Sequence, residues 1–183
     1  MVTPESSPGS PALVIVVDVA NVMGSRADGW WRDRAAAALR LCREVDALAA
    51  RGIPPERRPA GSRPAEGRPA KARSAEENPA EERPVEGRTA PPERSPSAPD
   101  FPRYVLVLEG RARAAAGLID APGPRTRIVQ APGSGDDTIV TESAAAVADA
   151  GSCLVVTADR ELRERCRDVG ASVAGPGWLI DLL

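Results

Sequence analysis

The sequence contains no histidine, and Lys71 is the only lysine among its 24 basic residues. Without histidine there can be no Ser-His-Asp triad, Cys-His pair, histidine-ligated zinc site or histidine general base. Lys71 lies in a segment that we expect to be unfolded, so a P-loop lysine or a Schiff-base lysine is not expected either. The side chains left for chemistry are mainly Asp, Glu, Arg, Ser and Thr. For an enzyme, this set favours carboxylates that hold a divalent metal ion.

Cysteine and long hydrophobic runs are also scarce. The three cysteines form no C-x-x-C pair, which is typical of buried thiols in a reducing compartment. The net charge is −2, which argues against a basic domain that simply coats nucleic acid. No basic leader precedes the first apolar run, 12–17, and that run is far shorter than the ~20 residues of a membrane helix. We therefore expect a soluble, cytoplasmic protein.

Residues 53–102 have a composition of their own. They hold 12 of the 19 prolines and as many acidic as basic residues, and Ile53, Val85 and Phe101 are their only large apolar residues. Such a segment cannot bury enough surface to offset the entropy of ordering it. We expect a disordered insert within a single domain formed by 11–52 and 103–183, after a disordered tail at 1–10. A docking segment for a protein partner is the functional alternative for this insert.

Strand and helix patterns alternate through the rest of the chain. The apolar runs at 12–17, 104–108 and 153–157 are typical of strands buried on both faces, and 127–130 and 171–174 predict two shorter strands. The patterns at 30–51, 136–149 and 159–169 predict helices, and 178–183 predicts a terminal turn or helix. Repeated strand-helix units predict an α/β fold: a three-layer, open, mainly parallel sheet with helices on both faces.

Acidic residues follow four of these strands. Asp18 ends the first, with Asn21 three residues later, and Glu109 ends the second. The carboxyl ends of parallel strands share one edge of the sheet, where sites form. The other residues of this predicted edge are Asp136 and Asp137 after the third strand, and Thr157 and Asp159 after the fourth.

These acids also have simpler roles. Asp136, Asp137 and Asp159 stand at predicted helix starts, where Asp is a favoured cap. Asp18 follows a buried strand directly, and a buried carboxylate is costly without a partner. Clustered carboxylates repel one another and their pKa values rise, and Mg²⁺ or Mn²⁺ removes that penalty. We therefore expect a Mg²⁺ or Mn²⁺ site that hydrolyses phosphodiesters.

Three segments carry a resemblance to a known family: 17–21 (VDVAN), 135–139 (GDDTI) and 156–160 (VTADR). In order and spacing they resemble the PIN-like nuclease superfamily, within it the NYN-domain group. The resemblance implies metal-dependent RNA cleavage by clustered acids. It implies that Asp18, Asp136 and Asp159 bind the metal, with Asp137 as a further ligand or as the general base. In the same resemblance, Glu109 is a further candidate ligand, Asn21 orients Asp18 or binds substrate, and Thr157 bonds to the site acids or the water.

Two further residues are candidates for holding the substrate. Trp31 could stack on a base and Arg160 could contact a phosphate, although a tryptophan at a helix start also packs as a staple. Three functions stay open: a metal-dependent ribonuclease, a phosphohydrolase of nucleotides with the same acids, and a non-catalytic module that binds nucleic acid or protein. RNA is the partner that we expect, and the sequence gives no indication of oligomeric state.

Overall fold

A five-stranded parallel sheet forms the centre of the computed structural model, which describes residues 13–59, 99–119 and 121–183. The sheet order is β3-β2-β1-β4-β5, and every neighbouring pair of strands is parallel. The strands are β1 (Val14–Asp18), β2 (Arg103–Leu108), β3 (Thr126–Gln130), β4 (Cys153–Val156) and β5 (Ser172–Ala174). All five residues of β1 are buried, as expected for the central strand of such a sheet. The α/β class and the parallel sheet are confirmed.

Helices connect these strands. They are α1 (Val19–Gly24), α2 (Arg34–Arg51), α3 (Gly135–Ala150), α4 (Arg160–Asp168) and α5 (Pro176–Ile180), with 3-10 turns η1 (Pro55–Arg57) and η2 (Gly110–Leu118). Four helices start at side chains that cap them: Asp18 accepts from Asn21, Asp33 from Ala36, Ser134 from Asp136 and Asp159 from Leu162. Each cap satisfies a backbone N–H that the helix itself leaves free.

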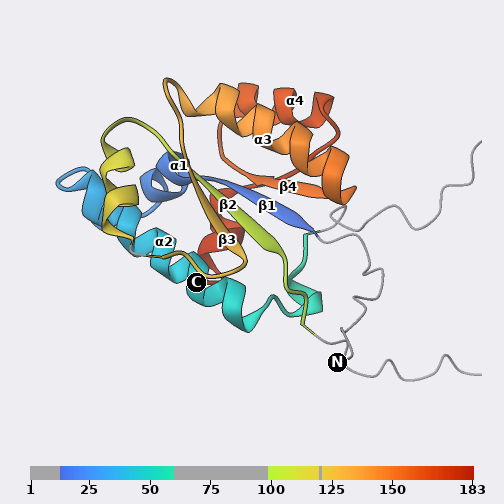
Figure 1. The fold of residues 1–183 in the computed structure, drawn as a ribbon, viewed down its shortest axis with the longest axis horizontal. Coiled ribbons are helices and arrows are strands. Elements are labelled where there is room, and N and C mark those ends of the chain that lie inside the picture. The colour runs from blue at the N-terminus through green and yellow to red at the C-terminus, as the bar shows by residue number, and fades with distance from the viewer. Residues whose placement is uncertain (1–12, 60–98, 120) are drawn as a thin grey trace, which may run out of the picture.

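Two hydrophobic clusters divide the residues of β1 between them. Ile15 and Val17 belong to a cluster with apolar residues of α1, α2, η2 and α5. Val14 and Val16 belong to a second cluster, with residues of α3 and α4. The division follows from the two-residue period of a strand, which sends alternate side chains to opposite faces. Figure 1 shows α3 and α4 side by side across the sheet from α2.

Among the α-helices, α2 and α1 differ most from the prediction, and the 3-10 turns η1 and η2 were not predicted. The expected helix over 30–51 begins only at Arg34, because Asp33 caps it and Gly29, at φ 77°, turns the chain before it. The short α1 was not predicted, because six residues show too little periodicity to reveal a helix. It follows β1 without a loop: Asp18 is both the last residue of the strand and the N-cap of α1.

The described structure also extends into the segment predicted to be an insert. Ile53 is buried and pairs with Asp100 in an antiparallel bridge, with N–O distances of 2.7 and 2.9 Å. Gly52 precedes this bridge at φ 79°, and a Cβ there would lie 2.9 Å from the carbonyl oxygen of Asp100. Residues 53–59 and 99–102 are thus part of the fold. The predicted tail at 1–10 and residues 60–98 of the predicted insert lie outside the described residues. No helix in the described part of the chain is long and apolar enough to cross a membrane.

Candidate acidic active site

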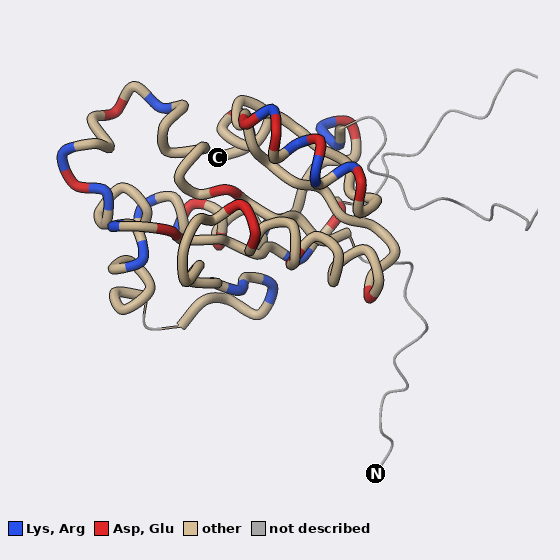
Figure 2. Tube along the Cα trace, turned by 90° about the horizontal axis from the view of Figure 1, so that it is seen from above, with Lys and Arg blue, Asp and Glu red and all other residues tan. Residues whose placement is uncertain are grey.

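A cleft of about 470 Å³ opens at the carboxyl end of β1. Strands β2 and β4 flank β1, so the chain leaves the central strand toward β2 and later returns on its other side at β4. Such a reversal creates a crevice at the strand ends. The cleft is lined by Asp18, Ala20, Asn21, Gly24, Ser25, Glu109, Asp136 and Asp159. In Figure 2, several acidic segments lie close together near the middle of the molecule, and other acidic and basic segments are spread around them.

Asp18 is the most buried carboxylate of the cleft, with 8% of its surface exposed. The backbone N–H of Asn21 donates to its Oδ1 at 3.0 Å, and the Thr157 hydroxyl donates to its Oδ2 at 2.9 Å. Burial raises the pKa of Asp18, the two hydrogen bonds oppose the rise, and the nearby Glu109 and Asp136 carboxylates add to it. Holding this charge here costs free energy, so packing alone does not explain the residue.

Hydrogen bonds join the ends of β1 and β4 across the cleft. The side-chain oxygen of Asn21 accepts from the backbone N–H of Ala158 at 3.1 Å. The Thr157 hydroxyl, fully buried, accepts from the backbone N–H of Asp159 at 3.1 Å while it donates to Asp18. Asn21 and Thr157 therefore position Asp18 and Asp159 relative to each other.

Glu109 reaches the cleft from the end of β2 and binds the start of α3. Its Oε2 accepts from the backbone N–H of Gly135 at 2.6 Å, a short distance for a carboxylate at a helix N-terminus. A Cβ at position 135 would lie only 2.9 Å from this oxygen. A larger residue at 135 would therefore displace the Glu109 carboxylate from its present position.

Asp136 is the carboxylate with the fewest protein partners. Neither of its oxygens accepts a hydrogen bond from the described residues, and its backbone N–H donates to Ser134 Oγ at 3.3 Å. Burial raises its pKa, and the charges of Asp159 and Glu109 raise it further, whereas Arg165 lowers it. A carboxylate with both oxygens free and a raised pKa is suited to accept a proton.

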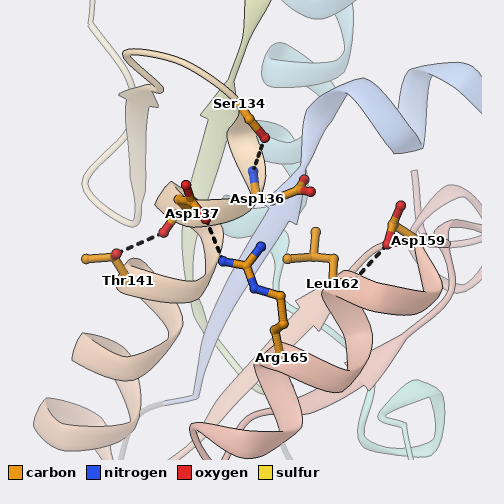
Figure 3. A network of polar contacts seen from close by, with 7 residues as sticks. All are labelled: Ser134, Asp136, Asp137, Thr141, Asp159, Leu162 and Arg165. Atoms are coloured by element: carbon orange, nitrogen blue, oxygen red, sulfur yellow. Dashed lines mark hydrogen bonds and ion pairs between the residues drawn. The ribbon is translucent and has the colours of Figure 1, made fainter.

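Asp137 does not line the cleft. Its side chain is 84% exposed and accepts from Arg165 of α4 at 2.5 Å, so it points away from the other acids (Figure 3).

Trp31 is also outside the cleft lining. It is 59% exposed and stands edge-to-face with Trp30, 6.3 Å between ring centroids. Arg160 is exposed at the first position of α4, next to Asp159.

Sequence reasoning missed two polar residues near this site. Ser25 lines the cleft, and its hydroxyl donates to the carbonyl oxygen of Asn21 at 2.9 Å. A serine four residues after Asn21 indicates such a hydrogen bond only within a helix, and α1 was not predicted. No sequence pattern indicates a role for Arg165, because its ion pair with Asp137 joins two helices that are separate in the sequence.

The chemistry of the cleft fits a hard divalent cation. Four carboxylates line it, no basic side chain does, and Glu109 Oε1, Asp159 Oδ2 and both Asp136 oxygens accept no hydrogen bond from the described residues. No three acidic or cysteine side chains within 13–59, 99–119 and 121–183 stand as a ready group for one metal ion. An ion in this cleft would therefore bind one or two of these carboxylates and complete its shell with water and substrate oxygens, as Mg²⁺ commonly does.

Comparison with known proteins does not assign this chain to a family. No model of a known protein family, no curated protein and no solved structure matches it.

Proposed function

We propose that this chain is a metal-dependent ribonuclease with a three-layer fold of the PIN-like, NYN-domain type. One observation carries the proposal: Asp18, Glu109, Asp136 and Asp159, from four separate segments, line a single cleft that has no basic side chain of its own. Phosphodiesters are anions, so such a cleft can hold one only when a cation offsets its charge. RNA as the substrate comes from the resemblance in 17–21, 135–139 and 156–160.

The main residues of the site have separate proposed roles. Asp18, Asp136 and Asp159, with Glu109 as a further candidate, are the carboxylates from which one or two would bind each Mg²⁺ or Mn²⁺ ion, and water and substrate oxygens would supply the remaining ligands. When bound, the ion lowers the pKa of a water molecule and stabilises the leaving oxygen. Asn21 and Thr157 keep Asp18 oriented, and an oxygen of Asp136 that does not bind the ion would accept the proton of the attacking water. Asp137, which pairs with Arg165, is not assigned as a ligand or as the base.

Cleavage of labelled single-stranded RNA by the purified full chain tests the proposal. We expect cleavage with Mn²⁺ or Mg²⁺. Cleavage should be lost with EDTA, which removes the ion, and in the Asp136→Asn variant, which removes a carboxylate of the cation site. The cleavage rate of DNA of the same sequence, compared with that of the RNA, measures the preference for ribose. A folded protein that binds Mn²⁺ but cleaves only nucleoside triphosphates would replace the proposal with nucleotide hydrolysis. Absence of both metal binding and hydrolysis would favour a non-catalytic binding module.

Gly135→Ala is expected to reduce cleavage by about tenfold with little loss of stability. The new Cβ would lie 2.9 Å from Glu109 Oε2 and push that carboxylate from its place in the cleft. Loss of a residue that orients a metal ligand typically costs 10–100-fold in activity. Alanine is also the better helix former, so the start of α3 itself should not weaken.

Gly133→Ala is the matched control, since no atom lies within 4 Å of a Cβ at that position. The cleavage rates of both variants test the effect on the reaction, and their urea unfolding midpoints test the effect on stability. Equal, unimpaired cleavage by the two would show that the position of Glu109 does not matter to the reaction.

A further inference from the structure

An ion pair joins the two helices that border the acidic cleft. Arg165 of α4 donates to Oδ1 of Asp137, in the first turn of α3, at 2.5 Å. Figure 3 shows Arg165 reaching from α4 to the turn of α3 that carries both Asp136 and Asp137. The pair therefore places a guanidinium group beside a carboxylate of the cleft.

Arg165 lies close to the cleft. Its partner Asp137 is next to Asp136 in the first turn of α3, and Asp136 lines the cleft (Figure 3). Two other arginines of this region are held elsewhere, whereas Arg160 is exposed beside Asp159. Arg26 pairs with Glu44 at 2.7 Å, and Arg113 donates to the carbonyl oxygens of Gly110 and Ala131. Arg165 is thus a cation at the rim of a site that has none in its lining.

The geometry of Arg165 also favours an anionic ligand. A guanidinium carries five N–H donors, and among the described residues only Asp137 accepts from that of Arg165. The remaining donors match the oxygens of a phosphate group. Because Asp137 already holds the side chain, less conformational entropy is lost when a phosphate binds.

We propose that Arg165 binds a phosphate group of the substrate strand at the rim of the cleft, and that Asp137 is a positioning residue for Arg165. This inference rests on the proposed function, since it assigns the contact that holds the RNA backbone beside Asp136. It gives Asp137 a role different from the ligand or base that the resemblance implies. The contact is sequence-independent, because it reads a phosphate and not a base.

The first test compares Arg165→Gln with Arg167→Gln. Arg167 is exposed on the same helix, two residues further on, so its replacement removes the same charge from a different direction. We expect Arg165→Gln to weaken binding of labelled single-stranded RNA about tenfold and to lower the slope of log Kd against log salt by about 0.7, one phosphate contact. Arg167→Gln should stay within about twofold of the unmodified chain. Binding is measured with Mg²⁺ in an Asp18→Asn background, in which cleavage is expected to be slow enough for the RNA to stay intact during the measurement.

The second test uses Asp137→Asn. A positioning role predicts a KM several times higher while kcat stays almost unchanged, whereas a metal ligand or base predicts that kcat falls by about two orders of magnitude or more. Arg165→Lys should recover part of the affinity lost in Arg165→Gln, since it restores the charge without the fork of donors.

The outcomes separate this inference from the proposed function. If the protein binds RNA without cleaving it, the comparison of Arg165→Gln with Arg167→Gln still decides the role of Arg165. Equal losses in the two variants, or no RNA binding by the unmodified chain, would overturn the inference. A collapse of kcat in Asp137→Asn would overturn the positioning role.

Discussion

Asp18→Asn is expected to reduce RNA cleavage by about 10²–10³-fold without destabilising the metal-free protein. The loss in rate follows from the place of Asp18 among the carboxylates that would hold the cation, where one electrostatic contact is commonly worth this much. Asparagine can still accept from the N–H of Asn21, and its amide can donate to Thr157 Oγ1. The variant removes a buried charge that lies near Glu109 and Asp136, so folding should become no less favourable.

The same variant should change how stability depends on pH. The pKa of Asp18 is raised in the fold above its ordinary value of 3.8, so the folded state binds more protons than the unfolded state between these two values. Stability therefore falls as pH rises from 3.8 through the raised pKa, and the penalty is present in full at higher pH. Asp136 acts in the same direction. Asp18→Asn should make the pH dependence of the metal-free protein shallower.

Urea unfolding across this pH range, together with cleavage rates, measures both effects. Asp168→Asn is the control, because Asp168 is exposed at the last position of α4, away from the cleft lining. An Asp18→Asn protein that unfolds much more easily than the unmodified chain would assign Asp18 a structural role. A variant that cleaves RNA at the normal rate would remove Asp18 from the reaction.

Mn²⁺ is expected to raise the melting temperature of the protein by several degrees. A ligand that binds only the folded state stabilises it by about 2.7 kcal/mol at 100 times its Kd. Here the ion would also relieve the repulsion among Asp18, Glu109, Asp136 and Asp159, two of which have raised pKa values for this reason in part. Thermal unfolding by circular dichroism with increasing Mn²⁺ gives the shift, and Mg²⁺ should act in the same direction.

Two controls separate binding in the cleft from general effects of salt. NaCl at matched ionic strength screens charges without occupying the site, so it should produce a smaller shift. Asp136→Asn should lose most of the Mn²⁺ effect, whereas Asp168→Asn should keep it. Lack of any shift with Mn²⁺, Mg²⁺ or Ca²⁺ would contradict a cation site in this cleft.

Strand composition is sufficient to predict the sheet. The apolar runs that form β1, β2 and β4 lie at the centre of the sheet, where both faces are covered and only apolar side chains fit. Helix starts are harder to predict. Asp33 falls inside the predicted helix but caps the observed one, since the same residue type suits the first turn and the cap.

The local sequence places the acids after their strands, and parallel strands necessarily bring those ends to one edge. On that basis the sequence alone predicts Asp18, Glu109, Asp136, Asp137 and Asp159 at this edge, and the cleft has all of them except Asp137 in its lining. The sequence does not decide between Asp136 and Asp137. Successive residues of a helix point about 100° apart, so only one of the two can face the cleft.

Tertiary structure decided that choice through the packing of α3 against α4. Once α3 is seated with Ile139 in the core, Asp136 lines the cleft and Asp137 meets Arg165, which lies 28 residues further along the chain. The contact of Glu109 with Gly135 arises in the same way, from β2 and α3 meeting across the sheet edge. The sequence by itself determined which residue types reach this edge, because strand and helix periods are local properties. Which of them face one another depended on the rotation and spacing of packed elements, which only the assembled core sets.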